Sequence, residues 1–337
     1  MTVLGPVAAD GLGVALMHEH LWMDARPLQA VHGYAAGSQE AWDAATAAEA
    51  RWNPGVHPGN YRLTDVDLVA SELVPFVAAG GRTIAEMTPP SLGRDPARVR
   101  EIAERAGVHV IQGTGQYLEA VHEPWIAEAT EAEIATRLIR DAVEGIDDTG
   151  VRAGIYGEVG TSNPVGSGER RVLRAVGAAS RETGLSVSVH VHPWGYEGST
   201  VLDELVGGGA DPERVILGHV TTAIDRPDDL ARLIDRGAIL GFDLFGFDHS
   251  LLGPGRYPPS DHDTARFVAR LVEAGHRDRL ILSQDVGVVS RLRRFGSWGY
   301  AHLLEHVVPI LRGLGLTDDD LDAILVRTPA RLLSVPG

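Results

Sequence analysis

Apolar segments of strand length alternate along this chain with longer segments in which apolar residues recur every third or fourth position. The second pattern, as in Val99, Ile102, Ala103 and Ala106, is typical of a helix with one buried face. Eight such alternations without a break in composition favour a single α/β domain over residues 1–337, built as a (β/α)8 barrel, or TIM barrel. The predicted strands are Val14–Leu21, Arg82–Thr88, His109–Tyr117, Ala153–Val159, Leu185–His192, Val215–Val220, Ala238–Leu244 and Leu280–Asp285.

The alternative fold is a doubly wound open sheet. That fold commonly carries a G-x-G-x-x-G motif after its first strand, and no such motif follows Val14–Leu21. An insertion from about residue 26 to residue 61 follows the first strand and is too long for an ordinary connection. Its aromatic residues Tyr34, Trp42 and Trp52 fit a cover over an active site and equally fit a homodimer contact, so both remain open.

Composition limits the classes of partner. The chain has 30 Lys and Arg residues against 46 Asp and Glu residues, a net charge of -16 that repels phosphate backbones and anionic membrane surfaces. Because there is no cysteine, nitrogen and oxygen atoms must supply any metal ligands. The chain has no leader-like N-terminal segment, and no apolar run approaches the roughly 20 residues of a membrane span. We therefore expect a cytoplasmic protein that acts on a small-molecule substrate, with no nucleic-acid or membrane partner.

Histidine and carboxylate side chains occur where several predicted strands end. His18 and His20 are two positions apart in an apolar segment, so they are expected on the same side of a strand. Each such residue alone has an ordinary explanation, either a core histidine bonded to a carbonyl or a carboxylate that caps a helix. Because active sites of (β/α)8 barrels lie at the carboxyl ends of the strands, we expect these side chains to meet in a two-metal site. The candidates at the strand ends are His18, His20, Glu158, His190, His192, His219 and Asp285, from which four histidines, one glutamate and one aspartate would supply the ligands.

These residues and their surroundings resemble the phosphotriesterase family of the amidohydrolase superfamily over nearly the whole chain. The resemblance implies that one metal is held by His18, His20 and Asp285, a more exposed metal by His190 and His219, and that Glu158 bridges the two. The best-known enzymes of the family bridge with a carboxylated lysine, whereas a glutamate is similar to the phosphotriesterase-related and phosphotriesterase homology proteins. The matching motifs are His18-Glu19-His20, Gly113-Thr114-Gly115, Arg152-Ala153-Gly154-Ile155, Glu158, His190, Gly218-His219, Asp285 and Thr328-Pro329-Ala330-Arg331.

The ligand set predicts a hydrolase that uses two divalent metal ions, for which we expect zinc, with manganese, cobalt and iron as alternatives. A hydroxide between the metals would attack a carboxylic ester, lactone or amide, and Asp285 would act as the catalytic proton acceptor. Thr222 and Leu244 stand where efficient organophosphate hydrolases of the family carry an acid and a histidine. Phosphotriester hydrolysis is therefore an alternative activity, and a metal-binding receptor or scaffold with little catalysis is another.

Four further residues are expected to contact the substrate. Tyr117 stands where lactonases of the family have a tyrosine, although packing at the barrel mouth would explain it as well. His192 and Trp194 follow the fifth predicted strand and are expected to form a wall of the pocket. Arg291 begins a basic cluster after the eighth strand, and its guanidinium suits an anionic substrate, although a solvated surface would explain it equally.

Overall fold

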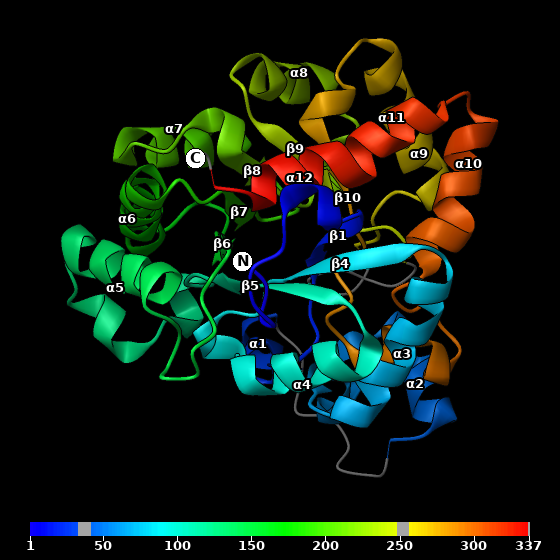
Figure 1. Cartoon of the computed structure of the whole chain (residues 1–337), viewed down its shortest axis with the longest axis horizontal. Coiled ribbons are helices and arrows are strands. Elements are labelled where there is room, and N and C mark those ends of the chain that lie inside the picture. Colours follow the sequence, from blue (N-terminus) through cyan, green and yellow to red (C-terminus); the bar gives the residue numbers. More distant parts are fainter. Residues whose placement is uncertain (33–41, 248–255, 336–337) are drawn as a thin grey trace.

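Eight parallel strands form one sheet in the computed structural model, which describes residues 1–32, 42–247 and 256–335. Each strand pairs with the next one along the chain, and helices surround the sheet (Figure 1). All eight predicted strands are confirmed, each one to four residues shorter than predicted. They are β1 (Val14–Glu19), β4 (Gly81–Glu86), β5 (His109–Thr114), β6 (Ile155–Gly160), β7 (Val187–His190), β8 (Val215–Leu217), β9 (Ile239–Phe242) and β10 (Leu280–Leu282).

The first and last strands of the sheet lie side by side and nearly close it into a barrel. The His18 amide donates to the Ser283 hydroxyl over 2.9 Å, and the Asp285 amide donates to the His18 carbonyl over 3.1 Å. Part of the interior is filled by a cluster of alanine, methionine and branched apolar side chains, as expected for this fold. Its central members are Ala15, Met17, Ala85, Met87, Ile111, Ile155, Ile216, Ile239 and Ile281.

Helices connect successive strands, and their ends follow local sequence signals. In α4, Asp95 accepts hydrogen bonds from the first turn, Pro96 occupies the first helical position, and Gly107 ends the helix at φ 68°. Thr130 and Glu133 form a reciprocal capping box at the start of α5. The connecting helices are α3 (Val66–Ala78), α4 (Pro96–Ala106), α5 (Glu131–Val143), α6 (Ser167–Thr183), α7 (Gly198–Gly208), α8 (Pro227–Asp235) and α9 (Asp261–Glu273). After β10 the chain forms α10 (Val308–Gly313), α11 (Asp318–Asp322) and α12 (Thr328–Leu333), with π-helical turns at Leu303–Val307 and Ala323–Arg327.

The insertion after the first strand forms a small layer of its own. Its ends are fixed by an antiparallel pair, β2 (Met23–Asp24) with β3 (Arg62–Leu63). Between them the structure describes α1 (Pro27–Val31) and α2 (Ala44–Trp52). Tyr34, one of the aromatic residues noted above, lies outside the described residues.

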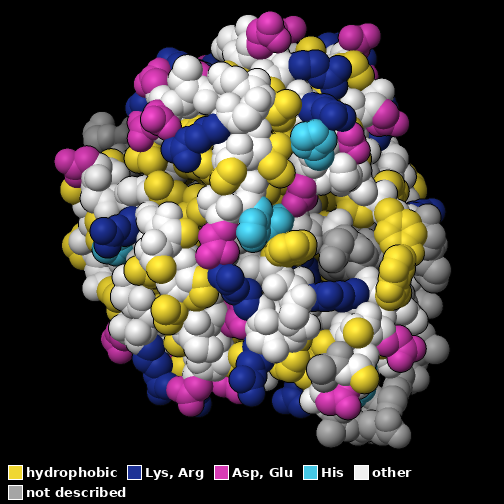
Figure 2. All heavy atoms as spheres, turned by 90° about the vertical axis from the view of Figure 1, so that its right-hand side faces the viewer, with side chains coloured by type: hydrophobic (Ala, Val, Ile, Leu, Met, Phe, Trp, Pro, Cys, Tyr) yellow, Lys and Arg dark blue, Asp and Glu magenta, His cyan; other side chains and the backbone are white. Residues whose placement is uncertain are grey.

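Acidic and basic side chains are interspersed over the face that includes α9 and α10 (Figure 2). Several are matched in pairs, as in Arg293 with Glu305 and Arg312 with Asp318. Among the described residues, no helix is both long enough and apolar enough to cross a membrane.

Candidate active site

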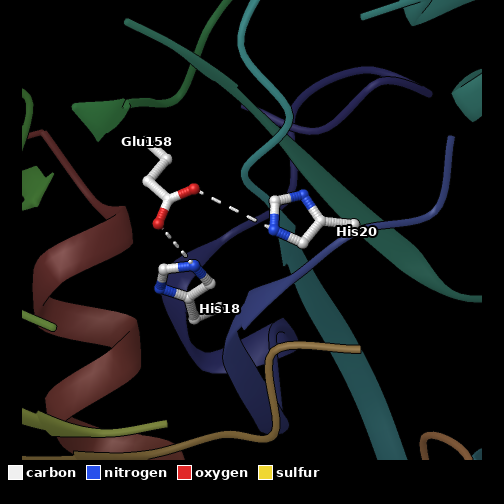
Figure 3. A group of neighbouring side chains, drawn as sticks. All are labelled: His18, His20 and Glu158. Atoms are coloured by element: carbon white, nitrogen blue, oxygen red, sulfur yellow. Dashed lines mark ion pairs between the residues drawn. The ribbon is translucent and has the colours of Figure 1, made fainter. Parts of the chain in front are cut away.

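Glu158, near the end of β6, lies at the centre of the predicted ligands. One of its oxygens, Oε1, is 3.2 Å from Nε2 of His18, and the other, Oε2, is 4.0 Å from Nε2 of His20 (Figure 3). The pairing register of β1 shifts between Leu16 and Glu19, and both imidazoles face the carboxylate. The prediction that these two histidines point to the same place is confirmed.

A second pair of histidines approaches the same carboxylate from neighbouring strands. Nδ1 of His190 is 3.2 Å from Glu158 Oε1, and Nε2 of His219 is 3.5 Å from it. The two imidazole nitrogens are 2.8 Å apart. Glu158 thus belongs to two groups of candidate ligands, one with His18 and His20 and one with His190 and His219.

These groups fit divalent metal ions. In each group the potential ligand atoms lie within 4.8 Å of one another, as they must when each is about 2.0–2.2 Å from a shared ion. Nε2 of His18 is buried and has no hydrogen-bond partner among the described residues, which a metal would satisfy. The donors are only imidazoles and carboxylates, a set suited to zinc, manganese, cobalt or iron. The chain contains no lysine, so a carboxylated lysine cannot serve as the bridge.

Asp285 completes the first group. Its Oδ1 is 3.2 Å from Nε2 of His20 and 3.9 Å from Nε2 of His18. Its side chain is 18% exposed, whereas those of His18 and Glu158 are 1% and 3% exposed, so Asp285 is more open to the cavity than these two ligands. Both Asp285 and His219 have a left-handed backbone, at φ 51° and φ 59°. Strain of this kind is concentrated at functional sites, where the surrounding structure maintains it.

The charges in the site are strongly coupled. Burial alone would raise the pKa of Glu158, but His18 and its other imidazole neighbours lower it well below the usual range. Burial likewise opposes ionisation of Asp285, yet His20 and His18 lower its pKa. Burial would lower the pKa of His219, but the Asp243 carboxylate raises it to about 10. The two ligand carboxylates are therefore ionised near neutral pH, as metal ligands must be.

The buried carboxylate of Glu19 holds the segment that carries Asp285. Glu19 accepts hydrogen bonds from the Ser283 hydroxyl at 2.8 Å and from the backbone amides of Gln284 and Val286 at 2.9 Å. The loop is thus tied to β1 on the side opposite the cavity. Glu19 belongs to the His-Glu-His motif but faces away from the candidate ligands.

Arg291 has a different position from the one that its sequence context indicated. Its side chain is buried, and its guanidinium donates to the carbonyls of Gln284, Asp285 and Phe245 over 2.5, 3.0 and 2.8 Å. It also stacks 4.1 Å above the Phe247 ring and is not among the residues that line the cavity. Because three of its N–H groups donate to backbone carbonyls and the residue does not line the cavity, the expectation of a substrate contact is corrected to a structural role.

A mostly apolar cavity of about 110 Å³ opens above the two histidine groups. It is smaller than the roughly 300–1,000 Å³ of pockets for drug-sized ligands, which indicates a small substrate or acyl group. Described residues of the insertion, among them Leu28 and Tyr61, contribute a wall of the cavity, and the homodimer contact stays a prediction. The lining residues are His20, Met23, Ala25, Leu28, His32, Pro54, Tyr61, Leu92, Tyr117, Glu158, His190, Pro193, His219, Leu244, Phe247, Asp285, Gly287 and Val288.

Of the four predicted substrate contacts, Tyr117 alone lines this cavity. Its hydroxyl is 3.0 Å from Nδ1 of His190, and burial raises its pKa well above the usual range, so it stays protonated. His192 and Trp194 lie one residue to either side of Pro193, and only the proline faces the cavity. The Trp194 amide instead donates to His192 Nδ1 over 3.2 Å, within the loop. The expectation that these two side chains form the pocket wall is therefore corrected.

Sequence reasoning missed the groups that lie behind the ligand histidines. Nδ1 of His20 is 2.9 Å from the Thr88 hydroxyl, which donates in turn to Glu86 over 2.5 Å. Asp243, directly after β9, contacts two of the histidines. Asp243 satisfies the same criterion that revealed the ligands, a charged residue at the end of an apolar strand.

Comparison with known proteins indicates the family of this chain. The model of the phosphotriesterase family matches residues 1–333. N-acetyltaurine hydrolase of Rattus norvegicus is 33% identical over 340 residues, which cover 99% of this chain and 97% of that protein. The solved structure of a resiniferatoxin-binding protein from Rhodobacter sphaeroides superposes with a TM-score of 0.93 at 35% identity, covering 100% of this chain and 96% of the other.

A phosphotriesterase homology protein from Escherichia coli, solved with phosphate in its active site, gives a TM-score of 0.82 at 27% identity over 96% of this chain and 100% of its own. The family model and the full-length similarity agree with the barrel fold. This chain belongs to the phosphotriesterase family of hydrolases.

Proposed function

We propose that this protein is a two-metal amidase that hydrolyses a small N-acyl substrate whose amine part carries an anionic group. The observation that carries the proposal is the position of Glu158, whose carboxylate is shared by two pairs of histidines at the floor of an apolar cavity. The similarity to N-acetyltaurine hydrolases favours an amide over the ester and lactone that the ligand set alone leaves open.

The chain's own residues would divide the work between them. One ion would be held by His18, His20 and Asp285. The other ion would be held by His190 and His219, and Glu158 would contribute a ligand to both. Bound divalent cations would lower the pKa of water and polarise the substrate carbonyl. Side chains around the ions would bind the substrate and transfer the proton.

Asp285 is the candidate acid and base. Its carboxylate reaches the cavity, so it can accept the proton of the attacking water while the oxygen bonds to the acyl carbon. When the carbon–nitrogen bond breaks, the same proton passes to the departing amine. The Tyr117 hydroxyl, which remains protonated, can donate a hydrogen bond to the acyl oxygen.

The cavity favours a short acyl group. Met23, Leu28, Leu244 and Phe247 provide apolar contacts, and the volume of about 110 Å³ suits an acetyl group better than a long chain. Neither lysine nor arginine is found among the described residues that line the cavity. The anionic amine part would therefore extend toward the open mouth, while the acyl group lies against the apolar wall.

The test is turnover of matched substrates by the purified protein with and without added Zn²⁺. N-acetyltaurine and N-acetylglycine should be hydrolysed, a neutral N-acetyl amine more slowly, and N-octanoyltaurine least. A chelator should abolish all activity. Hydrolysis of simple esters or lactones with no turnover of the amides would refute the amidase assignment.

A binding role without catalysis is the second candidate. The observation that favours it is the similarity in fold to a protein named for binding resiniferatoxin, together with the apolar cavity walls. Tight binding of an apolar ligand by metal-loaded protein that hydrolyses none of the substrates above would support this alternative.

A further inference from the structure

Each ligand histidine presents one ring nitrogen to Glu158 and directs the other away from it. The inward nitrogens are Nε2 of His18, His20 and His219 and Nδ1 of His190. A histidine that binds a metal through one nitrogen carries its proton on the other, and the group that accepts this proton fixes the orientation of the ring. The partners of the outward nitrogens therefore decide how rigidly each ligand is held.

Asp243 lies behind two of these rings. Its Oδ1 is 2.9 Å from Nδ1 of His219, and it accepts hydrogen bonds from the His219 backbone amide over 2.9 and 3.2 Å. Its Oδ2 is 3.4 Å from Nδ1 of His18. The carboxylate is 1% exposed, so water does not compete for these contacts.

We propose that Asp243 is a positioning residue shared by both metal subsites. His18 belongs to one group of ligands and His219 to the other. The carboxylate is hydrogen-bonded to the outward nitrogen of His219 at 2.9 Å, and it lies 3.4 Å from the outward nitrogen of His18, which has no other partner among the described residues and whose proton it would accept. It keeps both rings in the tautomer that leaves Nε2 free for a metal. Asp243 links the two subsites through the outward nitrogens of His18 and His219, and Glu158 links them through the inward nitrogens.

Charge supports the same assignment. Two divalent ions would bring four positive charges into a buried site whose ligand histidines must be neutral. Glu158 and Asp285 supply two negative charges, and Asp243 supplies a third without occupying a coordination position. No lysine or arginine among the described residues lining the cavity offsets these acids.

The segment after β4 provides a matched control. The outward nitrogen of His20 meets a neutral hydroxyl, that of Thr88, over 2.9 Å. Thr88 contacts a single ligand, so its loss should weaken only the subsite formed by His18 and His20. Comparing variants of Thr88 and Asp243 therefore distinguishes a residue that supports one metal subsite from a residue that supports both.

The experiment is a titration of apoprotein with Co²⁺ against a competing chelator, followed by the visible absorption of the bound ion. Asp243→Asn should lower the affinity for both ions by about 10- to 100-fold, the usual effect of losing such a partner. Thr88→Val should lower the affinity for one ion only, and Asp243→Glu should recover part of the loss. Asp243→Asn with both affinities at the wild-type level would overturn the proposal.

A measurement on the wild-type protein covers the case in which the variants do not fold. In Co²⁺-loaded protein, paramagnetically shifted imidazole N–H protons of His18 and His219 should exchange slowly with D₂O, and rapid exchange of both would overturn the proposal. The inference rests on the proposed two-ion centre. Wild-type protein that binds fewer than two ions refutes that centre, whereas two ions with Asp243→Asn unaffected refutes this inference alone.

Discussion

Replacing Arg291 by methionine tests whether this side chain supports the active-site loop or binds substrate. The substitution removes three donors from the buried carbonyls of Gln284, Asp285 and Phe245 while keeping an apolar chain of similar length. It also removes a positive charge that favours the ionised form of Glu19, whose side chain is fully buried. Leaving such groups without their partner typically costs about 3–5 kcal/mol.

That loss would be a large part of a typical stability of about 5–15 kcal/mol. Urea unfolding of metal-loaded protein should therefore show a clearly lower free energy of unfolding for Arg291→Met. Because Asp285 would lose one of its anchors, kcat should fall by roughly 100-fold, the effect of a displacement near 1 Å, with KM changing little.

Arg294→Met is the matched control, because this arginine belongs to the same basic cluster and its side chain is exposed. It should leave stability and kcat unchanged. If Arg291→Met is as stable as the wild type and only raises KM for anionic substrates, then the guanidinium binds substrate and our assignment is incorrect.

Three further predictions concern the site and its surroundings. Tyr117→Phe should lower kcat/KM about tenfold while metal content stays the same, because the hydroxyl helps to bind the acyl oxygen; unchanged kinetics would remove that role. Burial, with His190 and His192, lowers the pKa of His32 to about 4 from 6.5, so the unfolded chain takes up this proton first and stability falls as pH drops from about 6.5 to 4. His32→Asn should flatten that part of a urea-midpoint profile against pH, and an unaltered profile would contradict the burial. Reconstitution of apoprotein with Zn²⁺ should be independent of bicarbonate, because Glu158 needs no carboxylation; a bicarbonate requirement would exclude it as the bridge.

The barrel could be predicted because each strand is a run of apolar residues bounded by polar ones. The residues at which the strands end were harder to predict. The strand predicted over Leu280–Asp285 ends at Leu282, since the chain turns and Asp285 adopts a left-handed backbone. Aspartate tolerates that conformation, but nothing in the sequence requires it.

The ligand residues were predictable for a related reason, since an imidazole or carboxylate at the end of an apolar strand needs a partner. Arg291 was misjudged because an arginine beside an active site looks the same in sequence whether it faces solvent or backbone carbonyls. The apolar wall residues Met23 and Leu28 were not foreseen individually, because in sequence they fit ordinary packing as well as a substrate pocket. Only the tertiary structure places them beside Glu158.

The central claim is that Glu158 joins two metal ions, and quantitative metal analysis of wild-type protein and Glu158→Ala tests it most directly. After dialysis with Zn²⁺, the wild type should hold about two ions per chain, and Glu158→Ala should lose most of both, since each group of ligands includes this carboxylate. The exposed Glu144→Ala is the control and should keep both ions. Wild-type protein that is fully active with a single ion, or Glu158→Ala that retains two, would contradict the account.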